Sequence, residues 1–282
     1  MLKLPLKNFH FMMCFVIAIL ITPISCASAS EKSLDELIVL SGLRDQIEQF
    51  PQLMKAGMRS AKDESSTFSD SAYALILASI DQTILSSEIL VRVKTALAIE
   101  LSSADVELLL NWYVSDLGRQ ITQAEANSST ADADSKILAL ESQLLTNTER
   151  LDFAQRFDQL LGATDMNIEL QKHSSVAIFS AMVAAAHPQQ VTDISPFVDQ
   201  IEALSEQSRP VIEKDILLAF IYAYQNIETK ELVRYENFLN EVESKKFNRI
   251  VVKSLSAAIE LSISKWARSL MSIFQHKNIT VL

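Results

Sequence analysis

The stretch LSSADVELLLNWYVSDLGR, residues 101–119, combines a helix start signal with an apolar pattern of helical period. Ser102 followed three residues later by Asp105 is a capping box, in which each side chain accepts a backbone N–H at the start of a helix. Apolar residues then recur at helical spacing, with polar residues between them. They are Val106, Leu109, Leu110, Tyr113 and Leu117. We therefore expect an amphipathic helix that begins after Ser102 and packs its apolar stripe against other helices.

The scarcity of glycine and proline extends this expectation to the whole chain. The 282 residues include only four glycines and six prolines. A β-rich or α/β chain needs many tight turns, which depend on glycine, proline and Asn-Gly pairs. We therefore predict an all-α fold, a helical bundle.

Further helix boundaries follow from capping residues and breakers. Caps are expected at Ser33, Ser86 and Ser195, and Gly42 is expected to end the first helix. Residues 63–67 should form a loop. The remaining helices are expected over about 43–62, 70–83, 86–100, 135–145, 149–161, 165–186 and 210–225, and from residue 230 toward the C-terminus.

The two halves of the chain resemble each other. Residues 101–121 align with residues 227–247, which pairs Trp112 with Phe238. We predict two related helical repeats that bury their apolar faces together. The expected segments are a first repeat over 33–126, a linker and connecting helix over 127–149, and a divergent second repeat over 150–277.

Residues 101–119 also resemble the signature of domain-of-unknown-function family 2059. That signature is an acidic amphipathic helix followed by an aromatic-Tyr pair, a Ser, a Gly and a basic residue. The corresponding residues are Trp112, Tyr113, Ser115, Gly118 and Arg119. The resemblance is good over about 33–126. Over 150–275 it is weak, because Leu239, Glu241 and Ser244 replace the Tyr, Ser and Gly. It implies an exported bacterial helical protein without an established activity.

Two interpretations of this signature stay open. It could form a ligand or partner pocket. Alternatively, it could be a helix break, in which Ser115 caps the next helix, Gly118 allows close packing and Tyr113 belongs to the core. The second interpretation is favoured.

Residues 1–29 have the layout of a secretory signal peptide. Lys3 and Lys7 precede a short apolar run, and small residues with an A-x-A pattern follow. The run is too short to cross a hydrocarbon core of about 30 Å. We expect cleavage between Ala29 and Ser30 and a periplasmic location. Lipidation at Cys26 is disfavoured, because Pro23 occupies the position where such sites want a leucine-like residue.

The sequence lacks the motifs of several common catalytic and metal-binding sites. Both cysteines, Cys14 and Cys26, precede the expected cleavage, so we expect no disulfide and no thiolate metal site. The histidines are scattered, and no zinc, calcium, P-loop or nucleophile-elbow motif occurs. With 25 basic against 35 acidic residues, general nucleic-acid binding is not expected. We expect no cofactor and no metal. His173, His187 and His276 are too far apart in the sequence to form a zinc motif, and no EF-hand pattern surrounds Asp132 and Asp134.

The segment 244–277 is basic and amphipathic, and it allows two interpretations. It could lie on an anionic membrane surface. It could also turn its apolar stripe, which includes Trp266, toward the protein and place its basic face beside acidic helices. The second is favoured, because the stripe continues the pattern of the repeat.

The sequence therefore predicts an exported envelope protein that binds a partner or assists assembly without catalysis. Its partner is unknown, and another envelope protein is one candidate. A membrane-surface or lipid-associated factor is the first alternative, and an enzyme without a recognisable motif is the second.

Overall fold

The computed structural model describes residues 30–64, 70–128, 133–186 and 193–277. Over these residues the chain forms helices and no strand, so the all-α prediction is confirmed. The signal-peptide residues 1–29, together with Asp132 and His187, lie outside the described part. The helices are α1 (Glu31–Leu40), α2 (Leu43–Glu64), α3 (Asp70–Thr83), α4 (Ser86–Glu100), α5 (Ser103–Tyr113), α6 (Asp116–Ser128), α7 (Ala133–Leu144), α8 (Thr148–Leu161), α9 (Ala163–Ala186), α10 (Ser195–Tyr224), α11 (Thr229–Asn240) and α12 (Val242–Lys277).

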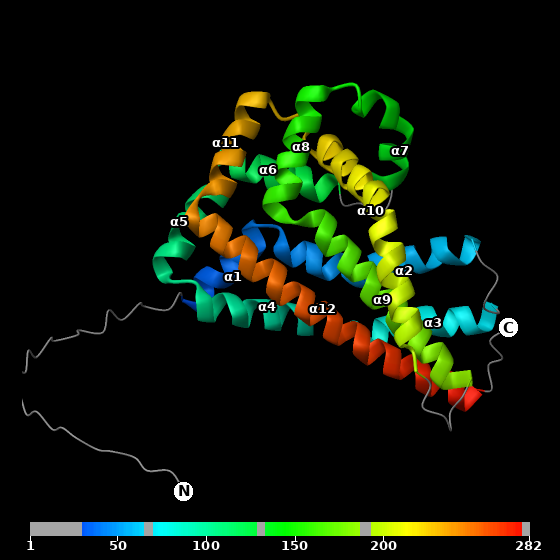
Figure 1. Cartoon of the computed structure of the whole chain (residues 1–282). Coiled ribbons are helices and arrows are strands. Elements are labelled where there is room, and N and C mark those ends of the chain that lie inside the picture. Colours follow the sequence, from blue (N-terminus) through cyan, green and yellow to red (C-terminus); the bar gives the residue numbers. More distant parts are fainter. Residues whose placement is uncertain (1–29, 65–69, 129–132, 187–192, 278–282) are drawn as a thin grey trace, which may run out of the picture.

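The long helix α12 organises the bundle. Figure 1 shows it crossing the molecule diagonally, beside helices from both halves of the chain. It packs against α3, α4 and α5 from the first half and against α9 and α11 from the second. Helix α10 in turn covers α6, α7, α8 and α9. The two halves are therefore interleaved around α12.

One hydrophobic core serves both halves. Leu37 in α1, Phe157 in α8 and Trp266 in α12 all have 0% of their surface exposed and belong to the same core cluster. A smaller cluster joins α7, α8 and α10 through Ile137, Ala154 and Leu218. Burial of apolar surface, at about 25 cal/mol per Å², therefore holds the two halves together.

The helix start predicted at Ser102 and the helix end predicted at Gly42 are confirmed. The backbone N–H of Asp105 donates to Ser102 Oγ at 3.2 Å, and the N–H of Ser102 donates to Asp105 Oδ2 at 2.8 Å. Val106 and Leu109 behind this capping box are buried. Gly42 follows the end of α1 with a φ of 73°, a conformation that glycine adopts without a steric penalty.

The three other expected caps were wrong. Ser30, not Ser33, caps α1, because its hydroxyl accepts the backbone N–H of Ser33 at 3.1 Å. Ser86 and Ser195 are the first residues of α4 and α10, and their side chains cap neither helix. A serine one position inside a helix start carries the same sequence signal as a true cap, so the pattern alone does not separate them.

Two helix boundaries also differ from expectation. Helix α10 runs without interruption through Pro210, where we expected a new helix to begin. A proline inside a helix costs about 3 kcal/mol, and the burial of Ile212, Leu217 and Leu218 in the following turns offsets that cost. The expected helix from residue 230 onward is divided into α11 and α12 at Glu241, which has an extended backbone.

The basic segment packs inward, as its favoured interpretation predicted. Trp266 is fully buried, and its indole N–H donates to Ser79 Oγ in α3 at 2.8 Å. Lys246 pairs with Asp105 at 2.7 Å, and Lys265 pairs with Glu88. Acidic side chains of α4 and α5 thus form ion pairs with basic side chains of α12.

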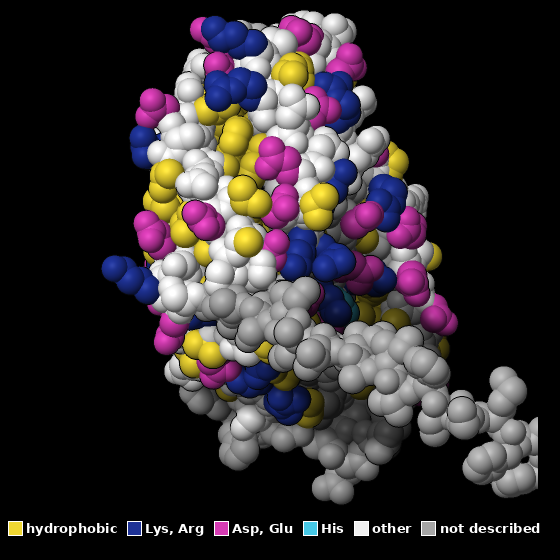
Figure 2. Space-filling view, turned by 90° about the vertical axis from the view of Figure 1, so that its left-hand side faces the viewer, with side chains coloured by type: hydrophobic (Ala, Val, Ile, Leu, Met, Phe, Trp, Pro, Cys, Tyr) yellow, Lys and Arg dark blue, Asp and Glu magenta, His cyan; other side chains and the backbone are white. Residues whose placement is uncertain are grey.

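Charges of both signs are also mixed on the surface. Figure 2 shows acidic and basic side chains interspersed with apolar ones on the face nearest to α5 and α11. One stretch, Tyr73–Glu100, is long and apolar enough by length and composition to cross a membrane. In the structure this stretch consists of α3 and α4, which meet at Ile84 and Leu85 and pack against α2 and α12.

The burial of Trp266 predicts its fluorescence. In a Trp112→Phe background, where Trp266 is the only tryptophan, we expect blue emission in buffer, because the indole is already shielded from water. Anionic vesicles should leave the emission maximum unchanged. The Trp266→Phe variant reports Trp112 alone and serves as control. A salt-sensitive blue shift with anionic but not neutral vesicles would contradict the inward packing of α12.

Candidate functional site

The signature residues form the turn between α5 and α6. Ser115 Oγ accepts the backbone N–H of Gly118 at 3.0 Å and thereby caps α6. A Cβ atom on Gly118 would lie 2.2 Å from the carbonyl oxygen of Trp112, closer than real Cβ contacts. Arg119 is exposed, pairs with Asp116 at 2.7 Å and donates to a backbone carbonyl of the turn. Ser115, Gly118 and Arg119 therefore shape the turn, which agrees with the favoured structural interpretation.

The aromatic pair of the signature reaches the other half of the chain. Trp112 stacks on Phe238 of α11, with ring centroids 4.3 Å apart and planes inclined by 5°. Tyr113 meets the same Phe238 ring edge-on at 5.7 Å. Trp112 and Phe238 are the residues that the predicted repeats place at equivalent positions. In each case the helix ends within a few residues, α5 after Trp112 and α11 after Phe238. The duplication itself stays a prediction.

A cavity of about 330 Å³ lies next to this aromatic contact, and we call it the seam cavity. Its walls come from both halves: α2, α5 and α6 of the first, and α8, α9, α10, α11 and α12 of the second. The apolar lining includes Leu43, Met166, Phe220, Leu239, Phe247 and Val251. The polar lining consists of Glu125, Tyr113, Tyr224, Tyr235, Ser41, Gln46, Ser128 and Asn248. A mainly apolar cavity with a few converging polar groups is the usual form of a small-molecule site.

Glu125 is the centre of the polar groups. Its Oε1 accepts the hydroxyl of Tyr224 at 2.7 Å and that of Tyr235 at 2.9 Å. Both tyrosines are buried. The carboxyl comes from α6 and the hydroxyls come from α10 and α11, so the cluster bridges the two halves at the cavity wall.

The pattern of α6 explains why Glu125 points inward. Leu117 and Ile121 are buried and lie on the face of α6 that packs into the core. Glu125 follows at the same spacing of four residues and therefore shares that face. Glu125 is not among the site residues predicted from the sequence. Its signal was an acidic residue in register with an apolar stripe.

Two arginines of α8 help to position the tyrosines. Arg150 donates to the backbone carbonyl of Tyr224 at 3.1 Å and also to that of Ile227, which holds the turn between α10 and α11. Arg156 binds the Glu236 carboxylate through two nitrogens, at 2.6 and 3.1 Å, and thereby ties α11 to α8. A two-point guanidinium–carboxylate contact fixes orientation as well as distance.

Burial shifts the pKa values of this cluster upward. It raises the pKa of Glu125, while the hydroxyl groups of Tyr224 and Tyr235 act in the opposite direction by stabilising the ionised carboxylate. Burial also raises the pKa of Tyr113, Tyr224 and Tyr235, and the nearby Glu125 charge adds to that effect. The three hydroxyls therefore stay protonated and able to donate hydrogen bonds at neutral pH.

The chemical capacity of the seam cavity is limited. The residues described as lining it include no lysine, arginine, histidine or cysteine. Within the described ranges, no group of three or more His, Cys, Asp or Glu could hold a metal ion. The arrangement offers one carboxyl group, tyrosine hydroxyls and aromatic rings, which suit recognition of a ligand by hydrogen bonds and charge.

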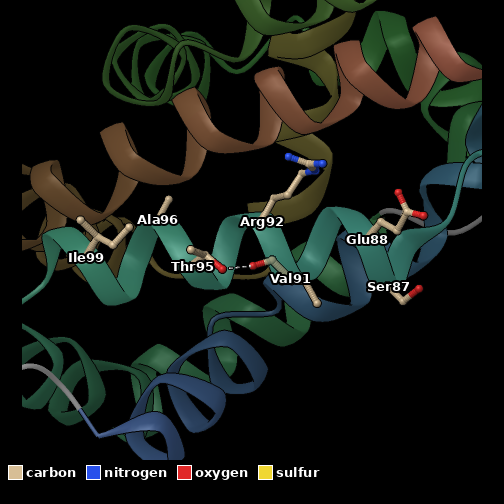
Figure 3. A pocket seen from close by; sticks show the side chains of 7 residues that line it. All are labelled: Ser87, Glu88, Val91, Arg92, Thr95, Ala96 and Ile99. Carbon is tan, nitrogen blue, oxygen red and sulfur yellow. Dashed lines mark hydrogen bonds between the residues drawn. The ribbon is translucent and has the colours of Figure 1, made fainter.

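A second hollow lies along α4 and has a volume of about 700 Å³. Its lining residues all project from this one helix, as Figure 3 shows, with Arg92 on the side of α12 and Val91 on the opposite side. Val91 and Ile99 are 63% and 77% exposed. Because the polar groups do not converge, this surface is a weaker candidate than the seam cavity.

No family model matches the chain, and neither a curated protein nor a solved structure was found to be similar to it. The resemblance to family 2059 thus stays a prediction carried by the residues of the signature. The site must be interpreted from its own geometry.

The close packing at Gly118 predicts that replacing this helical glycine by alanine lowers the free energy of unfolding, whereas the same change usually raises it. At an unhindered helix position, Gly→Ala stabilises by up to about 1 kcal/mol. Because a Cβ at Gly118 meets the backbone of Trp112, we expect Gly118→Ala to lower the free energy of unfolding by about 1–3 kcal/mol. Ser115→Ala, which removes only the cap, should cost about 1 kcal/mol. Urea unfolding measures both, and a stabilised Gly118→Ala protein would contradict the close packing.

The raised pKa of Glu125 predicts how stability depends on pH. The folded protein binds this proton more tightly than the unfolded chain, whose carboxyl has a pKa near the ordinary 4.5. The stabilising contribution is therefore complete below about pH 4.5 and is lost as the pH rises through the folded-state pKa. We expect the unfolding free energy of the wild type, relative to that of Glu125→Gln, to fall as the pH rises above this value.

Urea unfolding from weakly acidic to weakly basic pH measures this difference. Glu107→Gln, which changes an exposed carboxyl on α5, is the matched control and should keep the decline seen in the wild type. A difference between wild type and Glu125→Gln that stays flat or grows with pH would contradict the desolvation of Glu125.

Proposed function

We propose that this protein is an exported, non-catalytic binding protein of the cell envelope, which holds a small, largely apolar molecule in the seam cavity. The observation that carries the proposal is the convergence of Glu125, Tyr224 and Tyr235 on an otherwise mainly apolar cavity of about 330 Å³. This volume falls within the range of about 300–1,000 Å³ that small-molecule sites occupy.

The chemistry of the lining supports binding over catalysis. Acyl or phosphoryl transfer needs a nucleophile, a base and a group that stabilises developing charge. Glu125 supplies a carboxyl group, but the only other titratable side chains among the described lining residues are tyrosines with a raised pKa. These hydroxyls can orient a ligand, and they are poor bases at neutral pH.

The contacts of α12 support a binding protein over a membrane-surface factor. A surface-binding helix keeps its apolar face available for lipid. Here Trp266 is fully buried, and Lys246 and Lys265 pair with acidic residues of the same chain. The export part of the proposal rests on the signal-peptide layout of residues 1–29.

The experiment compares what the protein carries when it is purified from its own cells under native conditions. Organic extracts of the wild type, Ala223→Phe and Ala203→Phe would be analysed by mass spectrometry. Ala223 lines the cavity, whereas Ala203 lies exposed on the same helix, α10. We expect a small molecule from the wild type and from Ala203→Phe, and its loss from Ala223→Phe. Thermal unfolding checks that each variant is folded.

Two results would overturn this proposal. Extracts of wild type and Ala223→Phe that do not differ, including extracts with no ligand, would argue against a binding role for the cavity. The same preparation tests export, since N-terminal sequencing should begin at Ser30 and the protein should appear in the periplasmic fraction. A retained Met1 or a lipidated Cys26 would contradict the expected processing.

A further inference from the structure

Glu125 is the one charged side chain among the described residues that line the seam cavity. Glu125 is acidic, and no basic side chain occurs among the described residues that line the cavity. A ligand with a carboxylate or phosphate group would therefore meet like charge without a cationic partner in the wall. Such a juxtaposition opposes binding and acts as a filter on ligand charge.

The aromatic rings of the cavity favour the opposite charge. Tyr113, Tyr224, Tyr235, Phe220 and Phe247 all belong to the lining. The rings of Phe220 and Tyr224 are stacked, with their centroids 6.2 Å apart. The rings of Tyr224 and Tyr235 meet edge-on, with their centroids 5.9 Å apart. Aromatic faces attract ammonium groups through their quadrupole, and this attraction is stronger where water is excluded.

The hydrogen bonds of Glu125 fix where a cation would sit. The hydroxyls of Tyr224 and Tyr235 converge on one carboxyl oxygen, Oε1, and so orient the carboxyl group. A carboxylate held in this way can accept a charge-assisted hydrogen bond from an ammonium N–H, which is about twice as strong as a neutral one. The carboxylate, the orienting hydroxyls and the aromatic rings together are the chemistry that recognises an amine.

We propose that the seam cavity binds a small organic amine in its protonated form, with the ammonium group on Glu125 and the apolar body against the aromatic and aliphatic walls. This assignment rests on the proposed binding function. The cavity of about 330 Å³ corresponds to the liquid volume of about eleven water molecules at ~30 Å³ each. The ligand should therefore have about ten non-hydrogen atoms, as an aryl-alkyl amine does.

Three probes of similar shape and different charge test the assignment. Isothermal titration calorimetry at neutral pH would compare 2-phenylethylamine, 2-phenylethanol and 3-phenylpropanoate on the full chain. We expect the wild type to bind the amine at least about tenfold more tightly than the alcohol, and the carboxylate most weakly. This ranking needs no variant and therefore stands even if a substitution harms folding.

The variants then assign the preference to Glu125. Glu125→Gln keeps an oxygen that can accept the tyrosine hydroxyls but removes the charge, so it should weaken amine binding at least about tenfold and alter alcohol binding by less than about threefold. Glu107→Gln makes the same charge change on the exposed face of α5 and should leave the binding of all three probes unchanged.

Two outcomes would overturn the amine assignment. If the alcohol or the carboxylate binds as tightly as the amine, or Glu125→Gln keeps the amine preference, the ligand class is wrong, while a binding function confirmed by the native extract would still stand. If none of the probes binds the wild type, the assignment also fails. The proposed function is then judged separately, by the comparison of Ala223→Phe with Ala203→Phe.

Discussion

The partly buried carboxyl group of Glu125 constrains how the helices of this bundle meet. Removing a carboxyl from water costs several kcal/mol unless hydrogen-bond donors replace the water. At Glu125 these donors are the hydroxyls of Tyr224 and Tyr235, which come from helices far along the chain. Helices α10 and α11 must therefore sit where both hydroxyls reach one oxygen atom of α6. The seam cavity is the space that this arrangement leaves beside the aromatic rings.

The turn between α5 and α6 also helps to determine this geometry, because it positions the helix that carries Glu125. Gly118 lets the first turn of α6 approach the backbone of Trp112, and Ser115 caps the helix that carries Glu125. The same turn directs Trp112 and Tyr113 toward Phe238. Residues that appear purely structural thus determine where the cavity and its carboxyl lie.

Local features could be predicted from the sequence, and long-range ones could not. The capping box at Ser102 and the end of α1 at Gly42 depend on a few neighbouring residues, and both are confirmed. The boundary expected at Pro210 was wrong, because burial of distant side chains outweighs a local penalty. Glu125 was missed because a lone glutamate on a helix usually faces water, and its tyrosine partners lie about a hundred residues away.

The Glu125 carboxyl and the tyrosine hydroxyls form one interacting cluster that joins the halves of the chain. A double-mutant cycle of Glu125→Gln and Tyr235→Phe, followed by urea unfolding at neutral pH, measures this interaction. Direct contact predicts a coupling free energy of about 0.5–3 kcal/mol in magnitude. Effects that add to within about 0.3 kcal/mol would show that the two groups act independently and would contradict the account.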